Sequence, residues 1–141
     1  MHFESSRVIE ADPDRVWAVL VDGAAWPTWD SGVEAVDGAI DLGNKITIRS
    51  AAAPGRSFPV RVTTFEPNRR LELTGGMPLG LFTGVRTYTL AADSPTATSL
   101  TVREQYRGVL LRVIARSMPD LQPSFDQFTA GLKQRVEGTG P

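Results

Sequence analysis

The chain has 141 residues, with 15 basic and 16 acidic side chains and no cysteine. This length is typical of one domain with its own core, so we expect residues 1–141 to form a single domain that needs no metal or disulfide for stability. The balanced charge argues against a nucleic-acid partner, and the lack of cysteine excludes disulfides, thiolate nucleophiles and zinc–sulfur sites.

Histidine, the commonest general base near neutral pH, occurs once, as His2 at the chain end. The chain therefore lacks the histidines that a Ser–His mechanism or a histidine-rich metal site requires, and we expect no metal and no cofactor. The glycine-rich residues 75–80 lack the Lys-Ser/Thr pair of a phosphate-binding loop. No apolar run approaches the ~20 residues of a membrane span, and the first residues lack a signal-peptide pattern. We expect a cytoplasmic protein.

The first predicted elements are a strand and two short helices. Residues 3–11 predict a strand, which ends where Asp12 offers a helix N-cap and Pro13 fits the first helical position. Apolar side chains at helical spacing predict a short helix to about Asp22. Glycine and proline interrupt residues 23–30, which predicts a second short helix or a tight turn.

From residue 32 to residue 107, apolar residues alternate with polar ones. This alternation predicts six strands that each have one buried and one exposed face, and hence an antiparallel sheet. Turn residues such as Asp37-Gly38 and Asp93-Ser94-Pro95 separate the strands. The residues predicted to face inward are Ile46, Ile48, Val60, Val62, Leu71, Leu73, Phe82, Tyr88, Leu90, Leu100, Val102 and Tyr106.

After Gly108 the spacing becomes helical again. Residues 110–115 begin a helix that Pro119 and Pro123 must interrupt or restart. A stripe of apolar residues then predicts a long C-terminal helix; its members are Leu121, Phe125, Phe128, Leu132 and Val136. The predicted fold class is α+β, with a curved seven-stranded antiparallel sheet around this helix. Because one helix cannot fill the concave side of seven strands, we expect a cavity that suits an apolar ligand.

Two segments resemble a known superfamily. Residues 7–17, with Ala11-Asp12-Pro13 before Val16-Trp17, and the later Trp26-Pro27-Thr28-Trp29-Asp30 are similar to START/Bet v 1-like (SRPBCC) proteins, and most of all to the polyketide cyclase/dehydrase and lipid-transport branch. The resemblance covers residues 3 to 137 and implies a helix-grip fold. That superfamily includes cyclases, hydroxynitrile-type enzymes, lipid carriers, hormone receptors and chaperone activators, so the resemblance leaves the function open.

Arg86 and Glu104 are the first candidate site residues. The alternation of their strands points both side chains toward the concave face, and if Leu90 pairs with Leu100, Arg86 lies opposite Glu104. A charge in such a place must be paired. Two interpretations stay open: the pair orients a ligand carbonyl, phenol or carboxylate, or it is a half-solvated structural pair near the sheet edge. A register slip of one residue would separate the two side chains.

Most of the other candidates are aromatic or apolar. Residues 75–84 predict an apolar loop, either a gate at the cavity mouth or a cover for the sheet edge. Of the tryptophans, we expect Trp29 to reach the pocket and Trp17 and Trp26 to pack in the core. The further residues that we expect to bind the ligand are Met77, Phe82, Tyr88, Tyr106, Leu121, Phe125 and Phe128.

Three functions remain open at this point. The leading hypothesis is the carriage or sequestration of an apolar small molecule, such as a lipid, polyketide or aromatic compound. The alternative is a polyketide cyclase/dehydrase-type enzyme that uses Arg86, Glu104 and Tyr88. The third hypothesis is a protein-interaction module resembling chaperone activators, which would expose an apolar patch rather than enclose a pocket. The sequence leaves the ligand, catalytic turnover and the oligomeric state open.

Overall fold

The computed structural model describes residues 2–138; residues 1 and 139–141, which the expected domain 1–141 includes, lie outside the described part. Its elements in chain order are β1 (His2–Ile9), α1 (Pro13–Leu20), the 3-10 helix η1 (Gly23–Thr28), β2 (Val33–Asp37), β3 (Lys45–Ser50), β4 (Phe58–Glu66), β5 (Arg70–Met77), β6 (Phe82–Ser94), β7 (Ala97–Arg107), α2 (Leu111–Ser117) and α3 (Gln122–Val136).

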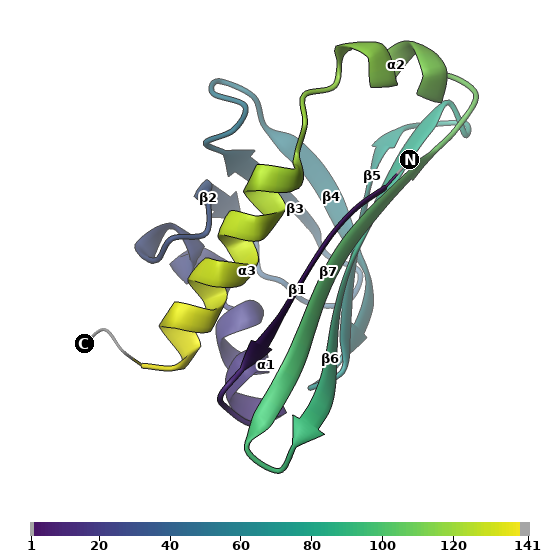
Figure 1. Ribbon diagram of the computed structural model, residues 1–141. Coiled ribbons are helices and arrows are strands. Elements are labelled where there is room, and N and C mark those ends of the chain that lie inside the picture. The colour runs from purple at the N-terminus through teal and green to yellow at the C-terminus, as the bar shows by residue number, and fades with distance from the viewer. Residues whose placement is uncertain (1, 139–141) are drawn as a thin grey trace.

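The strands form one antiparallel sheet in the order β1-β7-β6-β5-β4-β3-β2. The sheet curls, and α3 lies along its concave side (Figure 1). This arrangement confirms the predicted α+β helix-grip fold, including the two short helices after the first strand. Asp12 caps α1, since its Oδ1 accepts a hydrogen bond from Arg15 N at 3.1 Å.

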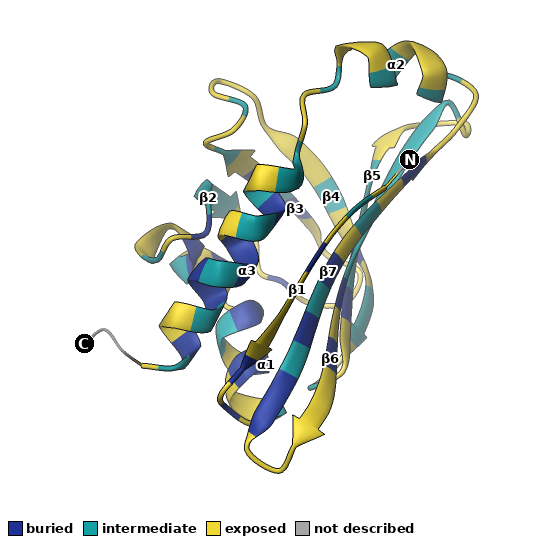
Figure 2. Cartoon of the chain, viewed as in Figure 1, coloured by how far each residue is buried: buried dark blue, intermediate teal, exposed yellow. Residues whose placement is uncertain are grey.

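Helix α3 turns one face toward the sheet. Its buried residues are Phe125, Phe128, Thr129, Gly131, Leu132 and Val136, and buried residues colour the inner side of helix and sheet in Figure 2. Gly131 is required by close packing, because a Cβ there would lie 1.9 Å from the carbonyl oxygen of Asp30. The turn after η1 therefore touches the backbone of α3 directly.

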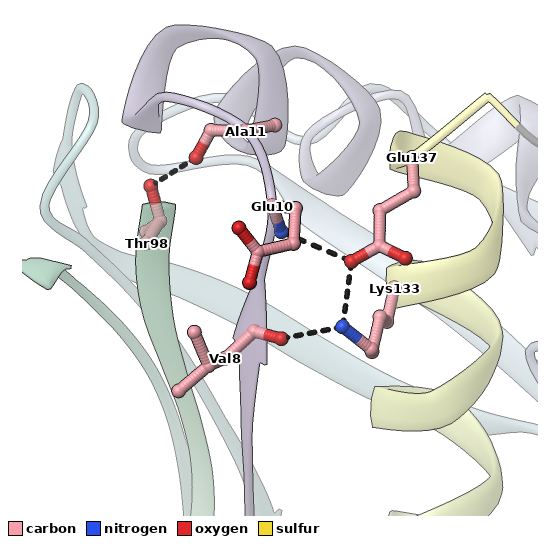
Figure 3. Close-up of polar contacts among 6 residues, drawn as sticks. All are labelled: Val8, Glu10, Ala11, Thr98, Lys133 and Glu137. Atoms are coloured by element: carbon pink, nitrogen blue, oxygen red, sulfur yellow. Dashed lines mark hydrogen bonds and ion pairs between the residues drawn. The ribbon is translucent and has the colours of Figure 1, made fainter. Parts of the chain in front are cut away.

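Polar contacts fasten the C-terminal end of α3 to the end of β1 (Figure 3). Lys133 Nζ donates to Val8 O at 2.7 Å and to Glu137 Oε2 at 2.6 Å. Glu137 Oε2 also accepts from the backbone N–H of Glu10 at 3.0 Å. These contacts lower the pKa of Glu137, chiefly through the hydrogen bond from Lys133.

The segment 75–84 differs from the sequence prediction. It is mostly strand, since Gly75 pairs with Gly84 and Met77 with Phe82, and only residues 78–81 form a turn. Glycine carries no side chain that could mark an inner or outer face, so strand periodicity disappears there. The expected ten-residue loop is wrong, and with it the interpretation of the whole segment as a gate.

Candidate functional site

A cavity of about 460 Å³ lies between the concave face of the sheet and the helices α2 and α3. Its walls come from residues 31–33 at the start of β2, from strands β3 to β7, from residues just after β3, and from one side of each helix. The size lies within the range of ordinary small-molecule sites. The cavity opens to solvent where its lining residues are exposed. We call these residues the cavity mouth; they are Ala52, Arg56, Phe58, Pro59, Gly76, Ser117 and Pro119.

Arg86 and Glu104 form an ion pair in the cavity wall. Residues 86 and 104 are opposite each other in the β6–β7 register, and Arg86 Nε donates to Glu104 Oε1 at 2.7 Å. Their side chains are 29% and 13% exposed, and the guanidinium carbon of Arg86 lies 4.7 Å from the ring centre of Phe125. Burial lowers the pKa of Arg86, but the charge of Glu104 and the nearby tyrosines raise it more, so the guanidinium stays charged.

Tyr88 brings a hydroxyl without a partner to the same wall. The residue lines the cavity and is fully buried, and its hydroxyl makes no hydrogen bond within the described part of the chain. Burial raises the pKa of Tyr88, although Arg86 is close enough to offset part of this effect. The phenol is therefore a protonated donor, and a buried donor without an acceptor is costly unless a ligand satisfies it.

Tyr106 closes the wall on β7. Its ring stacks on Phe82, with centroids 5.7 Å apart and planes at 17°, and meets the edge of Phe3 at 6.1 Å. Gly84 lies opposite Tyr106, where a Cβ would come within 3.1 Å of the ring. Glycine at this position makes room for the tyrosine. Burial and the charge of Glu104 raise the pKa of Tyr106, so this phenol also keeps its proton.

The α3 side of the cavity is aromatic. Phe128 lies 5.7 Å from Tyr88 and 5.0 Å from Trp26, measured between ring centres. Trp26 is fully buried and its Nε1 donates to Leu20 O, so it belongs to the core as expected. Phe125 and Phe128 are themselves nearly buried, which leaves the cavity with a firm apolar wall.

The structure brings eight of the ten predicted site residues together around the cavity: Phe82, Arg86, Tyr88, Glu104, Tyr106, Leu121, Phe125 and Phe128. Trp29 and Met77 lie elsewhere. The ring of Trp29 packs beside Phe128 with ring centres 5.2 Å apart, and of these two residues only Phe128 lines the cavity. Met77 ends β5 with 46% of its surface exposed, because the strand continues through a segment that we expected to fold back as a loop.

Several lining residues were not among the site candidates. Leu73 and Val102 line the cavity from the inner faces of β5 and β7; their alternation marked them as inward, which was the available signal. Ile114 and Met118 line it from α2 and its end. No periodic signal in so short a helix distinguishes the side that faces a cavity.

The described residues were compared with the requirements of two kinds of site, a metal cluster and a membrane-spanning helix. Among residues 2–138, no three His, Asp or Glu side chains gather in a group suited to a metal ion. Within the same range, no helix has the length and hydropathy needed to cross a bilayer.

The sequence profile of a family described as polyketide cyclase / dehydrase and lipid transport matches residues 1–137. The chain belongs to this family. No curated protein matches the chain in sequence. The match covers nearly the whole chain, so all the strands and helices described above lie within the family's domain.

Solved structures support the fold. Protein MLL2253 from Mesorhizobium loti is 20% identical, with a TM-score of 0.75 and full coverage of both chains. The Aha1 protein from Colwellia psychrerythraea, solved as a dimer, is 17% identical, with a TM-score of 0.73 and 99% coverage of both chains. The di-domain ARO/CYC protein BexL of the BE-7585A biosynthetic pathway is 20% identical, with a TM-score of 0.74. The match covers 100% of the present chain but only 48% of BexL.

Proposed function

We propose that the protein binds an apolar small molecule in its cavity, as a carrier or sequestering protein, and holds an acceptor oxygen of that molecule at Tyr88. A lipid, a polyketide or an aromatic compound has the required apolar character. The observation that carries the proposal is the apolar cavity of about 460 Å³ with a buried, unpartnered phenol in its wall. The apolar wall favours the body of the ligand, and the hydroxyl favours one oxygen on it.

The Arg86–Glu104 pair supports the same proposal. Because Nε of Arg86 is engaged by Glu104, the orientation of the guanidinium plane is set before a ligand enters. The phenol of Tyr88 beside it is a neutral donor, and the guanidinium adds positive potential. A carbonyl, phenol or enol oxygen is favoured there, whereas a ligand cation is disfavoured.

The test uses two probes of nearly equal shape, 2-acetylnaphthalene and 2-ethylnaphthalene, which differ in one carbonyl oxygen. We expect the wild type to prefer the ketone by about three- to tenfold, the value of one hydrogen bond to a buried group. Tyr88→Phe removes the donor and should abolish that preference while the hydrocarbon binds as before. Equal affinity of both probes for the wild type would refute the role of Tyr88, and failure of both to bind would refute the cavity as a binding site.

A cyclase/dehydrase-type enzyme is the second candidate, and the position of Tyr88 beside the ion pair favours it. A protonated phenol and a guanidinium can stabilise an enolate oxygen, and a carboxylate such as Glu104 can accept a proton. Native mass spectrometry of protein purified from its own host separates the candidates. A carrier releases the ligand chemically unchanged. A dehydrase converts added ligand to a product lighter by one water molecule, and a cyclase that retains the water gives an isomer of the same mass, which liquid chromatography separates from the ligand.

A further inference from the structure

An exposed apolar surface lies at the end of the sheet where β5 turns into β6. Leu79 is 94% exposed, Val109 78% and Val113 66%. The turn and the segment before α2 are joined, since Val109 N donates to Gly80 O at 3.4 Å and Leu110 N to Leu81 O at 2.9 Å. We call these three apolar residues, together with Arg107, Arg112 and Arg116, the apolar–basic tip.

The backbone conformation of the turn is unfavourable for a leucine at position 79. Leu79 and Gly80 are the central residues of the 78–81 turn, with φ of 61° and 70°, and Leu81 N donates to Pro78 O at 3.2 Å. Turns with two positive φ angles favour Asn, Asp or Gly at both positions. A leucine at the first position is strained and gains no burial in return. Folding alone does not account for this choice.

Helix α2 adds a second anomaly. None of its seven described residues is buried, although Leu111, Val113 and Ile114 are apolar (Figure 2). The helix projects beyond the sheet at the same end (Figure 1). A helix with apolar side chains and no buried residue lacks the packing that usually stabilises it.

The charged side chains of the tip are all positive. Residues 107–119 hold three arginines and no acidic residue, and residues 73–85 hold no charge at all. Arg107, Arg112 and Arg116 are exposed and make no ion pair within residues 2–138. The two acids that flank this stretch in the sequence have other partners: Glu104 accepts from Arg86, and Asp120 accepts from the backbone N–H of Gln122. The whole chain carries a net charge of −1, so the tip is a local exception.

From these observations we infer that the apolar–basic tip docks on a lipid surface with anionic headgroups. Leucine and valine side chains would enter the interface while the arginines lie at headgroup level, which is how short amphipathic helices bind such surfaces. A leucine raised on a strained turn fits insertion into lipid. The tip adjoins the cavity, since Ile114 and Ser117 of α2 line it. Docking at the tip would therefore bring the cavity close to the lipid surface, whichever molecule the cavity holds.

The first experiment is co-flotation of the intact protein with vesicles of phosphatidylcholine alone or of phosphatidylcholine with phosphatidylglycerol. We expect binding to the anionic vesicles that weakens as salt is raised, and little binding to phosphatidylcholine. Equal binding to both, or no binding to either, would overturn the inference.

The second experiment uses Leu79→Asn. Asparagine suits the turn better than leucine, so the melting temperature should stay the same or rise while vesicle binding falls about tenfold. Leu42→Asn is the matched control: Leu42 is 61% exposed, on a loop whose Gly43 bonds to Val62 in the middle of β4. This control should bind like the wild type. A stable Leu79→Asn variant with unchanged binding would overturn the inference.

The third experiment removes charge. Arg112→Gln with Arg116→Gln should weaken binding about 25-fold, because each arginine near an anionic surface contributes a factor of about five. Arg49→Gln with Arg103→Gln removes the same charge from exposed sites on strands β3 and β7 and should have little effect. Equal losses in both pairs would overturn the tip as the docking site. Sedimentation velocity without lipid provides a further check. If the wild type is a dimer and Leu79→Asn dissociates it, the tip joins two copies of the chain, and the inference of lipid docking is overturned.

Discussion

Arg86 and Glu104 lie opposite each other on β6 and β7, and their side chains meet at 2.7 Å in the cavity wall. With 29% and 13% of their surfaces exposed, they stand between a surface pair and a fully buried one. The strength of their coupling is therefore measurable, and it decides how rigidly the polar end of the cavity is held.

We expect a double-mutant cycle of Arg86→Met and Glu104→Gln to give a coupling of about 1–3 kcal/mol in the free energy of unfolding. Exposed pairs give about 0–1 kcal/mol, whereas breaking one side of a buried pair costs about 3–5 kcal/mol. The double variant should be more stable than Arg86→Met alone, because that single change leaves a carboxylate without its counter-charge. Urea denaturation measures all four proteins. Additive losses would show that the two side chains are not paired in solution.

The two tyrosines of the chain, Tyr88 and Tyr106, provide a direct optical test. Burial raises the pKa of both, so the native protein should show no tyrosinate absorbance near pH 10, where exposed tyrosine ionises. In urea both should ionise at about pH 10. Absorbance at the tyrosinate band in native and unfolded protein measures the difference; a native titration near pH 10 would contradict the burial.

The same shifts predict how stability changes with pH. The unfolded state releases phenol protons above about pH 10 while the native state keeps them, so the free energy of unfolding must fall as pH rises through that value. Tyr88→Phe removes one of these groups, and the variant should lose less stability between neutral pH and pH values above 10 than the wild type. Identical slopes in the two proteins would show that Tyr88 ionises without cost in the folded state.

The lowered pKa of Glu137 predicts that the free energy of unfolding falls as the pH is lowered. Its pKa is lowered, first by the hydrogen bond from Lys133, so its contribution is present above its ordinary pKa and is lost as pH falls through the lowered value. Glu137→Gln should lose less stability on acidification than the wild type. Hydrogen exchange at the end of α3 measures this locally, with Glu34→Gln as a control on β2. Equal acid sensitivity of Glu137→Gln and wild type would contradict the contact.

Gly131→Ala tests the close contact between α3 and the turn after η1. In an exposed helix this change stabilises by about 1 kcal/mol. Here the new Cβ would collide with Asp30 O, so we expect destabilisation of about 1–3 kcal/mol or more. Ala130→Gly next to it is the control, with a loss of about 1 kcal/mol from helix propensity alone. A stabilised Gly131→Ala protein would show that helix and turn are not in contact.

Phe128→Trp tests the cavity volume. The larger ring should occupy part of the space beside Tyr88 and weaken the binding of an apolar dye such as Nile red, at a stability cost of about 1–3 kcal/mol. Val8→Trp, on the edge strand β1, is the control. A cooperatively folded Phe128→Trp protein with undiminished dye binding would place the dye outside the cavity.

Much of the fold follows from the sequence for a physical reason. A strand with one buried face must alternate, so Val60, Leu73 and Val102 reveal their strands and their orientation. The pairing of Arg86 with Glu104 follows once Leu90 pairs with Leu100, because register propagates two residues at a time along a hairpin. The structure has this register.

The remainder depends on tertiary contacts that have no local pattern. The contact of Gly131 with Asp30 joins segments that are far apart in the sequence, and no local sequence pattern around Gly131 predicts it. Trp29 packs beside Phe128 without lining the cavity, and only tertiary packing decides which of two neighbouring aromatic residues reaches it. The strand through Gly75 and Gly84 is invisible to periodicity because neither residue has a side chain.

The wall of the cavity is also the hydrophobic core: Ile48, Leu73, Tyr88, Val102, Phe125 and Phe128 belong to both. A substitution that reshapes this wall therefore draws on a total stability of only about 5–15 kcal/mol. Ala52, Arg56, Phe58 and Pro119 at the mouth are exposed and carry no such penalty. Diversification of ligand preference among close relatives should thus begin at the rim and reach the interior late, after compensating changes elsewhere have widened the margin of stability.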